Sequence, residues 1–148
     1  MVVKNLRASR ENYLFLKQKD VALILNVSYQ SISNWENERD IIPISRLIKY
    51  ADFFNFSLDF LFGINSNVYN NNPINIDLKS IGANLLKLRK LNNMSQTDII
   101  KKLNISKSSY SDYENGKRLI PTIVLFGLTT IYKPFSIDAL FNRKKQDN

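Results

Sequence analysis

Cysteine and histidine are both absent from this chain of 148 residues. Without cysteine there is no disulfide framework and no thiolate site, which fits a bacterial cytoplasm. Without histidine the chain lacks the commonest general base and the commonest metal ligand. A catalytic site would have to use paired carboxylates or lysine, so we expect no enzymatic activity, no bound metal and no cofactor.

Long apolar runs are also missing. No run approaches the roughly 18 residues that a membrane-spanning helix needs. Charged residues interrupt the first segment at Lys4, Arg7, Arg10 and Glu11. We therefore expect no membrane span, no secretory signal and a cytoplasmic location.

Acidic residues are scarce in the second half of the chain. The net charge of the sequence is +8, and residues 79–148 carry thirteen lysines and arginines against five acidic residues. Residues 1–63 are close to neutral. A basic segment attracts polyanions, of which duplex DNA is the commonest. The plain alternative is a charged surface that only aids solubility.

What the sequence does contain is one segment written twice. Residues 18–43 and 96–121 match without a gap, 78 positions apart. Apolar character repeats too, since Val21 and Trp35 return as Ile99 and Tyr113. Self-similarity of this length indicates two copies of one small helical module. The identical residues are, in the first copy, Gln18, Asp20, Leu25, Asn26, Ser28, Ser31, Ser33, Glu36, Asn37, Ile42 and Pro43.

Both copies are expected to be helical, because apolar residues recur at three- and four-residue spacing and nothing alternates with period two. Pro43 and Pro121 stand where a fourth helix begins, and Gly63 and Gly116 end helices. Serine caps are expected at Ser28, Ser57, Ser95, Ser106 and Ser136. The predicted helices are 4–15, 17–25, 28–37, 43–55 and 57–62, and then 79–92, 95–103, 106–115, 121–132 and 136–142.

An asparagine-rich segment lies between the two copies. Residues 64–78 include Pro73 and several asparagines, a composition that predicts a linker. The expected organisation is a near-neutral first domain at 1–63, the linker, a basic second domain at 79–142 and a tail at 143–148.

The motifs of the two copies resemble the XRE-type helix-turn-helix domain of phage repressor and Cro proteins. The second copy shows Leu85, Leu88, Arg89, Met94-Ser-Gln-Thr-Asp-Ile99, Leu103-Asn-Ile-Ser106, Tyr113-Glu-Asn-Gly116 and Pro121. The first copy ends on Ser57-Leu-Asp-Phe-Leu-Phe-Gly63, as such domains often do. The resemblance implies an all-α fold of two tandem five-helix lambda-repressor-like helix-turn-helix domains.

The resemblance also implies which residues read DNA bases. The third helix of each domain places its N-terminal residues in the major groove. There lysine donates to guanine, glutamine and asparagine pair with adenine, and aspartate accepts from cytosine N4. The base-reading candidates are Lys107, Ser108, Ser111 and Asp112 in helix 106–115, and Tyr29, Gln30, Ser33 and Asn34 in helix 28–37.

Other residues are expected to hold the DNA backbone. In this family a glutamine begins the second helix, whose N-terminus favours a phosphate, and here these residues are Gln18 and Gln96. Asn115, Lys117 and Arg118 follow the third helix of the second copy and suit phosphate contacts.

Two glutamates of the third helices are expected to be structural rather than catalytic. The resemblance implies that Glu114 pairs with Arg89, and Glu36 with Arg10. Such a pair fixes the orientation of the helices, and removing one partner costs more than the pair contributes.

The first copy departs from this pattern at three points. It has one extra residue between Arg10 and the second helix. It has Glu38 where the second copy has Gly116, so a left-handed residue there costs about 1 kcal/mol, unless Asn37 takes that conformation. Its loop 36–40 is acidic where the matching loop of the second copy is basic.

These departures predict that the second copy is the main DNA reader. The first copy is then a weaker reader or a protein-contact module. Its phenylalanines either fill the core or include an exposed patch for dimerisation: Phe53, Phe54, Phe56, Phe60 and Phe62. The second copy has a departure of its own, one residue added around Lys133-Pro134.

The favoured interpretation is a sequence-specific regulator of transcription that binds double-stranded DNA, a repressor of phage or mobile-element type. The alternative is a protein-interaction module on the same fold, such as an antitoxin, an anti-defence protein or a repressor antagonist. Its protein partner would bind the first copy. No small-molecule ligand is expected, because the two copies and the linker occupy nearly the whole chain.

Two modes of binding DNA stay open. An extended linker of 15 residues spans at most about 50 Å, and successive half-sites lie about 34 Å apart. One chain can therefore act as a pseudo-dimer with two unlike half-sites. A homodimer that uses the second copy of each chain is the other arrangement.

Overall fold

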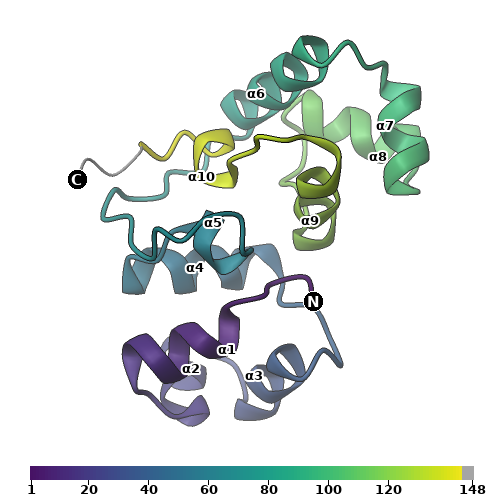
Figure 1. Ribbon diagram of the computed structural model, residues 1–148. Helices are drawn as coiled ribbons and strands as arrows, with labels where there is room; N and C mark the ends of the chain where they lie inside the picture. Colours follow the sequence, from purple (N-terminus) through teal and green to yellow (C-terminus); the bar gives the residue numbers. More distant parts are fainter. Residues whose placement is uncertain (145–148) are drawn as a thin grey trace. The chain divides into compact units, whose positions relative to one another are not determined.

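The computed structural model describes residues 1–144, which form two compact units, Met1–Asn71 and the part of Asn72–Asn148 that is described. Figure 1 shows that both units are built from helices. Across the described residues the only β-type pairing is an isolated bridge between Phe56 and Tyr69. The predicted all-α fold is confirmed. Residues 145–148 of the predicted tail lie outside the described part.

The helices of each unit follow the predicted order closely. None of those described is long and apolar enough to cross a membrane. The first unit contains α1 (Leu6–Ala8), the π-helix η1 (Ser9–Leu14), α2 (Gln18–Leu25), α3 (Tyr29–Glu36), α4 (Ile44–Phe54) and α5 (Leu58–Leu61). The second unit contains α6 (Leu78–Leu91), α7 (Gln96–Leu103), α8 (Lys107–Glu114), α9 (Thr122–Ile131) and α10 (Ile137–Leu140).

The predicted serine caps all accept a backbone N–H at the start of a helix. Ser28 accepts from Ser31 at 3.2 Å and Ser106 from Ser109 at 3.1 Å, so both third helices begin alike. The other three caps make the same bond at 3.0–3.1 Å. Each bond satisfies an N–H that has no partner within the helix and so fixes where the helix begins.

The repeated apolar positions form the two cores. On α2 and α3, Val21, Ile32 and Trp35 are buried, and their counterparts on α7 and α8 are buried too. Val27 and Ile105 are half-buried beneath the turn between those helices. The further core residues of the two units include Leu25, Leu47, Tyr50, Leu58 and Leu61, and Leu85, Ile120, Leu125, Leu128 and Ile137.

The extra residue of the first copy is taken up as a π-helix. A π-turn holds one residue more than an α-turn, and η1 begins one residue before Arg10. The segment then closes at Phe15, whose φ is +54°, the same value as at Asn93 in the second unit. The insertion therefore ends before α2 begins, and α2 and α3 are in register with α7 and α8 of the second copy.

The predicted linker is divided between the two units. Val68 accepts a hydrogen bond from the Ser57 N–H at 2.9 Å, and the Tyr69 ring stacks on Phe56 with 5.8 Å between centroids. These contacts place the segment up to Asn71 in the first unit. The domain boundaries 1–63 and 79–142 stay predictions; the division by contacts falls after Asn71.

The start of the predicted tail is part of the second unit. Arg143 is buried, its Nε donates to the Asn72 carbonyl at 2.7 Å, and its Nη1 lies 3.2 Å from Asp138. These contacts tie Asn72 to the end of α10.

The phenylalanines of the first copy divide by exposure. Phe56, Phe60 and Phe62 are buried and fill the core. Phe54 is half-buried, and Phe53 is 60% exposed at the end of α4. A dimer role for an exposed patch within this cluster stays a prediction.

Candidate nucleic-acid interface

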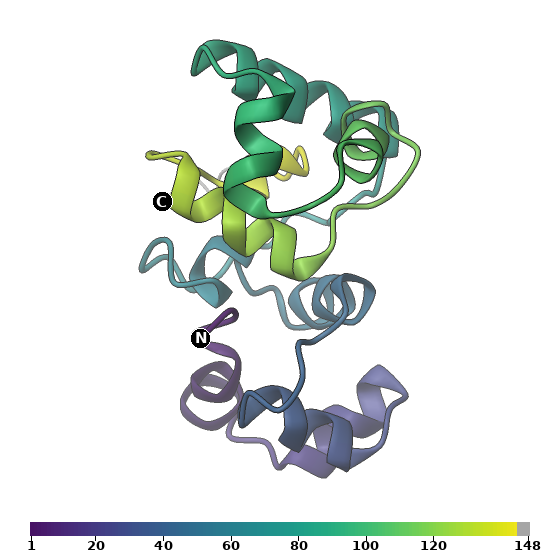
Figure 2. The same cartoon turned by 90° about the vertical axis from the view of Figure 1, so that its right-hand side faces the viewer.

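Each unit contains two consecutive helices joined by the same tight turn. Between α2 and α3 the chain turns at Asn26, and between α7 and α8 at Asn104, both with φ of +55°. Asparagine tolerates this left-handed conformation better than most residues. Figure 1 labels both helix pairs, and the α7–α8 pair can be followed in the green part of Figure 2.

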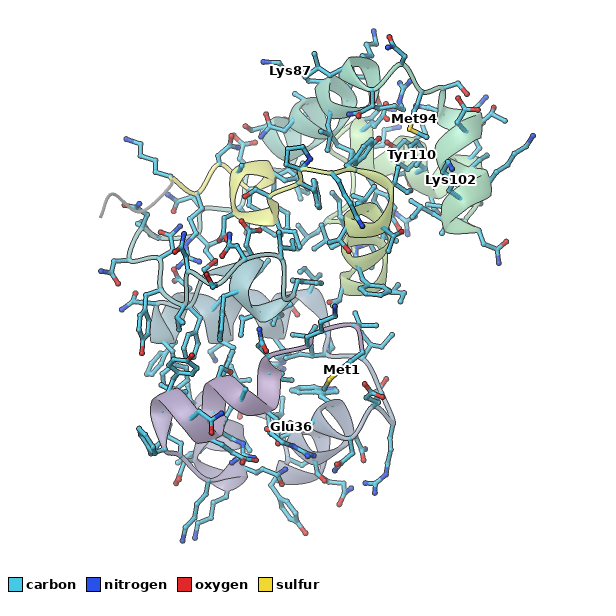
Figure 3. The ribbon with its side chains drawn as sticks, viewed as in Figure 1. Met1, Glu36, Lys87, Met94, Lys102 and Tyr110 are labelled. Carbon is cyan, nitrogen blue, oxygen red and sulfur yellow. The ribbon has the colours of Figure 1, made fainter. Side chains whose placement is uncertain are left out.

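In each unit an arginine on the helical segment before the helix pair, η1 or α6, binds a glutamate on the second helix of that pair, α3 or α8. Arg89 donates to both oxygens of Glu114, through Nε at 2.7 Å and Nη2 at 3.0 Å. Arg10 holds Glu36 in the same way, at 2.7 Å on each side. Bidentate pairs of this kind fix geometry as well as charge. Figure 3 labels Glu36 at this place in the first unit.

The arginine also binds the chain two residues before the next helix, α2 or α7. Nη1 of Arg89 donates to the Met94 carbonyl and Nη1 of Arg10 to the Leu16 carbonyl, both at 2.9 Å. One guanidinium thus ties together its own helical segment, the chain before the next helix and the end of α3 or α8. We name this arrangement of arginine, glutamate and carbonyl the clasp.

The clasp holds the two glutamates ionised. Burial alone raises the pKa of the Glu114 carboxyl, but its hydrogen bonds, above all from Arg89, lower that pKa below its ordinary value. Glu36 behaves alike: burial raises its pKa, and Arg10 and Gln18 bring it down. Hydrogen bonds from a cation favour the charged carboxylate. The clasp accounts for both carboxylates as structural groups.

The glutamines predicted to hold phosphate are oriented by the clasp. The amide nitrogen of Gln96 donates to Glu114 at 3.2 Å, and that of Gln18 to Glu36 at 3.2 Å. A side-chain amide nitrogen carries two N–H groups, so one stays free for another acceptor. Both glutamines are the first residues of their helices, where an anion is favoured.

In the second unit the predicted base-reading residues lie along α8. Lys107 and Ser108 are exposed in its first turn, and Ser111 and Asp112 are half-buried one turn later. Ser111 accepts from the Asn115 amide at 3.1 Å. Asp112 lies 3.3 Å from the Nε atom of Arg118.

In the first unit the corresponding residues lie along α3. Tyr29 and Gln30 are exposed, with Tyr29 61% exposed. The Gln30 amide donates to Asn34 at 3.1 Å, and Ser33 accepts from Asn37 at 3.2 Å. Both helices have a hydrogen bond from an asparagine to a serine four residues earlier. They differ at the next matching position, where Asn34 is bound by Gln30 and Asp112 by Arg118.

The residues predicted to contact phosphate after α8 have different surroundings. Lys117 is exposed. The Asn115 carbonyl accepts from Lys79 at 3.2 Å. Arg118 pairs with Asp112 and also lies over the Tyr113 ring, 5.4 Å from its centroid. The sequence alone did not indicate these two contacts of Arg118.

A second arginine lies beside the first clasp, and sequence reasoning missed it. Arg7 donates to the Asn37 side chain at 2.5 Å and lies 3.5 Å from Glu36. Its spacing of three residues from Arg10, one helical turn, is the signal that could have found it.

The two helix pairs present different surfaces at matching positions. The second unit has exposed Lys101 and Lys107. At these positions the first unit has Leu23, which is 84% exposed, and Tyr29. After the third helix, Lys117 and Arg118 correspond to Arg39 and Asp40. The two units share the helix pair and the clasp, and the exposed lysines at these positions are found in the second unit only.

Comparison with known proteins accounts for both copies. A family model described as Helix-turn-helix matches residues 15–61 and 85–140, together more than half of the chain. No curated protein and no solved structure matches the chain.

Proposed function

The chain belongs to the XRE-type, lambda-repressor-like helix-turn-helix family of DNA-binding regulators, and on that premise we propose that it recognises a specific double-stranded DNA site and represses transcription there. Occupying an operator blocks access to it, and no second activity is needed. Small regulators of phages and mobile elements have this form. A cytoplasmic location goes with this role.

The second unit is the main reader in this proposal. The observation that carries it is the set of exposed cations around α7 and α8. Outside the clasp, two acidic residues there, Asp98 and Asp112, stand against five basic ones: Lys101, Lys102, Lys107, Lys117 and Arg118. Such a surface neutralises phosphates and releases counterions, which supplies much of the affinity for DNA.

Base reading is assigned to the outward residues of α8. Lys107 and Ser108 stand in its first turn, which enters the major groove in this family. Gln96 and Asn115 lie at the ends of α7 and α8, where phosphate contacts orient the helix. The clasp holds these two helix ends in one fixed relation.

A second function has its own observation in the first unit. Leu23 and Tyr29 are exposed where the second unit has lysines, and Glu38 and Asp40 make the following loop acidic. Exposed apolar side chains and an acidic loop on one unit suit a protein partner better than a phosphate backbone. The first unit would then serve as a protein-contact module, as in an antitoxin, an anti-defence protein or a repressor antagonist.

The experiment that tests the main proposal is a salt titration of DNA binding. Fluorescence anisotropy of a random-sequence duplex is measured at about 50 and 200 mM salt with the parent protein and two variants. The first variant is Lys107→Gln/Lys117→Gln. The second, a control with the same loss of charge, is Lys87→Gln/Lys90→Gln on α6. Figure 3 labels Lys87 there and Lys102 on α7.

We expect the parent to bind in low salt and to lose affinity steeply as salt rises. Each lost phosphate contact should reduce the slope of log K against log salt by about 0.9, so the first variant should lose up to about 1.8 and the control much less. Equal losses of slope in both variants would mean that the affinity for DNA depends on the net charge of the protein and not on these two positions. No binding at micromolar protein in low salt would contradict the proposal and favour the protein-contact function.

A further inference from the structure

We infer that Arg118 is a positioning residue that sets Asp112 to read a base pair with an exposed amino group, cytosine first. This inference rests on the proposed function. It reassigns Arg118, which the sequence predicted as a phosphate contact. It keeps Asp112 as a base reader, as the sequence predicted, and makes the preference of Asp112 depend on Arg118.

Two contacts hold the Arg118 guanidinium in place. Nε lies 3.3 Å from Oδ2 of Asp112, and the group lies over the Tyr113 ring at 5.4 Å from the centroid. Tyr113 is buried, so its ring does not move freely. A planar guanidinium both stacks on an aromatic ring and pairs with a carboxylate, which an ammonium group does less well.

The loop after α8 brings Arg118 back to Asp112. Gly116 has a φ of +68°, and the Lys117 N–H donates to the Asp112 carbonyl at 2.9 Å. A Cβ at position 116 would come within 2.8 Å of the Lys79 backbone. The turn is therefore fixed by packing, and it delivers the residue two positions later to the side of Asp112.

The first unit shows what happens when this pair is absent. Its loop turns alike, since the Arg39 N–H donates to the Asn34 carbonyl at 2.9 Å. The matching residues are Asn34 and Asp40, so the carboxylate and the cation have both gone. Asn34 is held by Gln30 instead. The carboxylate on the recognition helix therefore occurs together with an arginine that faces it.

Pairing with Arg118 reduces the repulsion between the Asp112 carboxylate and the DNA phosphates. A lone carboxylate on α8 would be repelled by the phosphates that the neighbouring lysines attract. Arg118 offsets that charge through Oδ2, and the second oxygen of Asp112 stays available to accept a hydrogen bond. In the major groove cytosine N4 and adenine N6 offer N–H donors, whereas guanine and thymine offer acceptors at the corresponding place.

The test is selection of binding sites from a pool of random duplexes. It uses the full-length parent, Asp112→Asn, Arg118→Gln and Arg118→Lys, with Lys117→Gln as a neighbouring exposed cation of equal charge. Circular dichroism checks that each variant is folded. Affinities are then measured for the selected site and for a site with cytosine replaced by thymine at the position in question.

We expect the parent to select cytosine at one position and to lose at least about fivefold in affinity on the change to thymine, the lower end for a good base contact. Asp112→Asn and Arg118→Gln should both lose most of that preference, and Arg118→Lys should keep part of it. Lys117→Gln should weaken binding to both sites alike and keep the preference.

The outcomes separate this inference from the function it rests on. If Arg118→Gln behaves like Lys117→Gln, with uniform weakening and an unchanged preference, Arg118 is a phosphate contact and the inference is overturned alone. A parent that selects sites without a preference that depends on Asp112 also overturns it alone. A parent that binds no duplex overturns the proposed function and this inference together.

Discussion

Glu38 adopts the left-handed backbone conformation that the second copy gives to a glycine. Its φ is +62°, close to the +68° of Gly116 at the matching position, whereas Asn37 has a φ of −97°. The sequence left open whether Glu38 or Asn37 would take the left-handed conformation. The structure shows that Glu38 does, because the loop after α3 follows the same course as the loop after α8.

Replacing Glu38 with glycine should stabilise the first unit. Glycine adopts positive φ without the steric cost that a side chain brings, so we expect a gain of about 1 kcal/mol in the free energy of unfolding. The fluorescence of Trp35, the only tryptophan, reports urea unfolding of this unit. Glu38→Ala is the matched control, since it removes the carboxylate and keeps the Cβ. An equal gain in both variants would trace the effect to charge.

Glu36 should make the first unit sensitive to acid. Its pKa in the folded state lies below the ordinary value of 4.5, so its contribution to stability is complete above about pH 4.5 and is lost as pH falls through the lowered pKa. Urea unfolding of the parent, followed by Trp35 fluorescence from pH 7 to pH 3, should show this loss.

The variant Glu36→Gln isolates that contribution. Because it removes the buried carboxylate of the pair and leaves Arg10 only the half-exposed Glu11, 3.3 Å away, it should cost about 3 kcal/mol near neutral pH. Its remaining stability should fall less between pH 5 and pH 3 than that of the parent. A variant with the parent's full acid loss would show that other carboxyls cause it.

For single residues, the sequence predicted the two arginine–glutamate pairs but not the contacts of Arg118. Arg10 lies 2.7 Å from Glu36 and Arg89 lies 2.7 Å from Glu114, the pairs that the family resemblance implied. The contacts of Arg118 could not be predicted in this way. They depend on a turn after α8 that brings a residue back six positions along the chain, and the first copy has a different residue there.

At the scale of helices, repeat and capping residues predicted nearly every boundary. The exception is η1, where the sequence indicated one inserted residue but not how it is accommodated. Spacing alone cannot distinguish a longer turn from a π-helix. In the structure the clasp fixes Arg10 against α3, and the π-helix Ser9–Leu14 takes up the extra residue.

The start of α2 offers a second test at this scale. Lys17 occupies the cap position that Ser95 occupies before α7, with similar backbone angles, but makes no side-chain cap bond. Its N–H already donates to Asp20 at 2.9 Å. Lys17→Ser should complete the reciprocal cap and stabilise the first unit by about 1 kcal/mol.

The control for this cap is Lys17→Ala, which removes the lysine and supplies no acceptor. Trp35 fluorescence during urea unfolding compares the two variants with the parent. If Lys17→Ala gains as much as Lys17→Ser, the benefit comes from losing the lysine and the cap contributes nothing.

At the scale of the whole molecule, the repeat predicted two similar units and the charge distribution predicted that they differ. The division of the linker was not predictable from its asparagines. Tyr69 stacks on Phe56, a residue 13 positions earlier, and Asn72 is held by Arg143. Contacts between residues so far apart in sequence have no local signature in a polar segment.

If the helix pair of the first unit also lies against DNA, adding positive charge to that pair should strengthen the salt dependence of DNA binding. Tyr29→Lys/Asp40→Asn places a cation where the second unit has Lys107 and removes an acidic group. We expect the salt dependence of binding to a random duplex to steepen by about 0.9 for one new phosphate contact. Fluorescence anisotropy at several salt concentrations measures it.

The control gains the same charge at two exposed positions in the segment after α5, through Ser66→Lys/Asn67→Lys. It should steepen the salt dependence less. An unchanged slope in Tyr29→Lys/Asp40→Asn would mean that the first unit does not lie against the DNA backbone.

The π-helix has a practical consequence. Phe15, where this segment closes, is 81% exposed, and the residues after it keep the register of the second copy although the turn before it is longer. The turn between Arg10 and Phe15 thus already tolerates a change in length. It is the natural place to insert a cysteine for a fluorescent dye, and in a chain without other cysteines such a label would attach at that site alone.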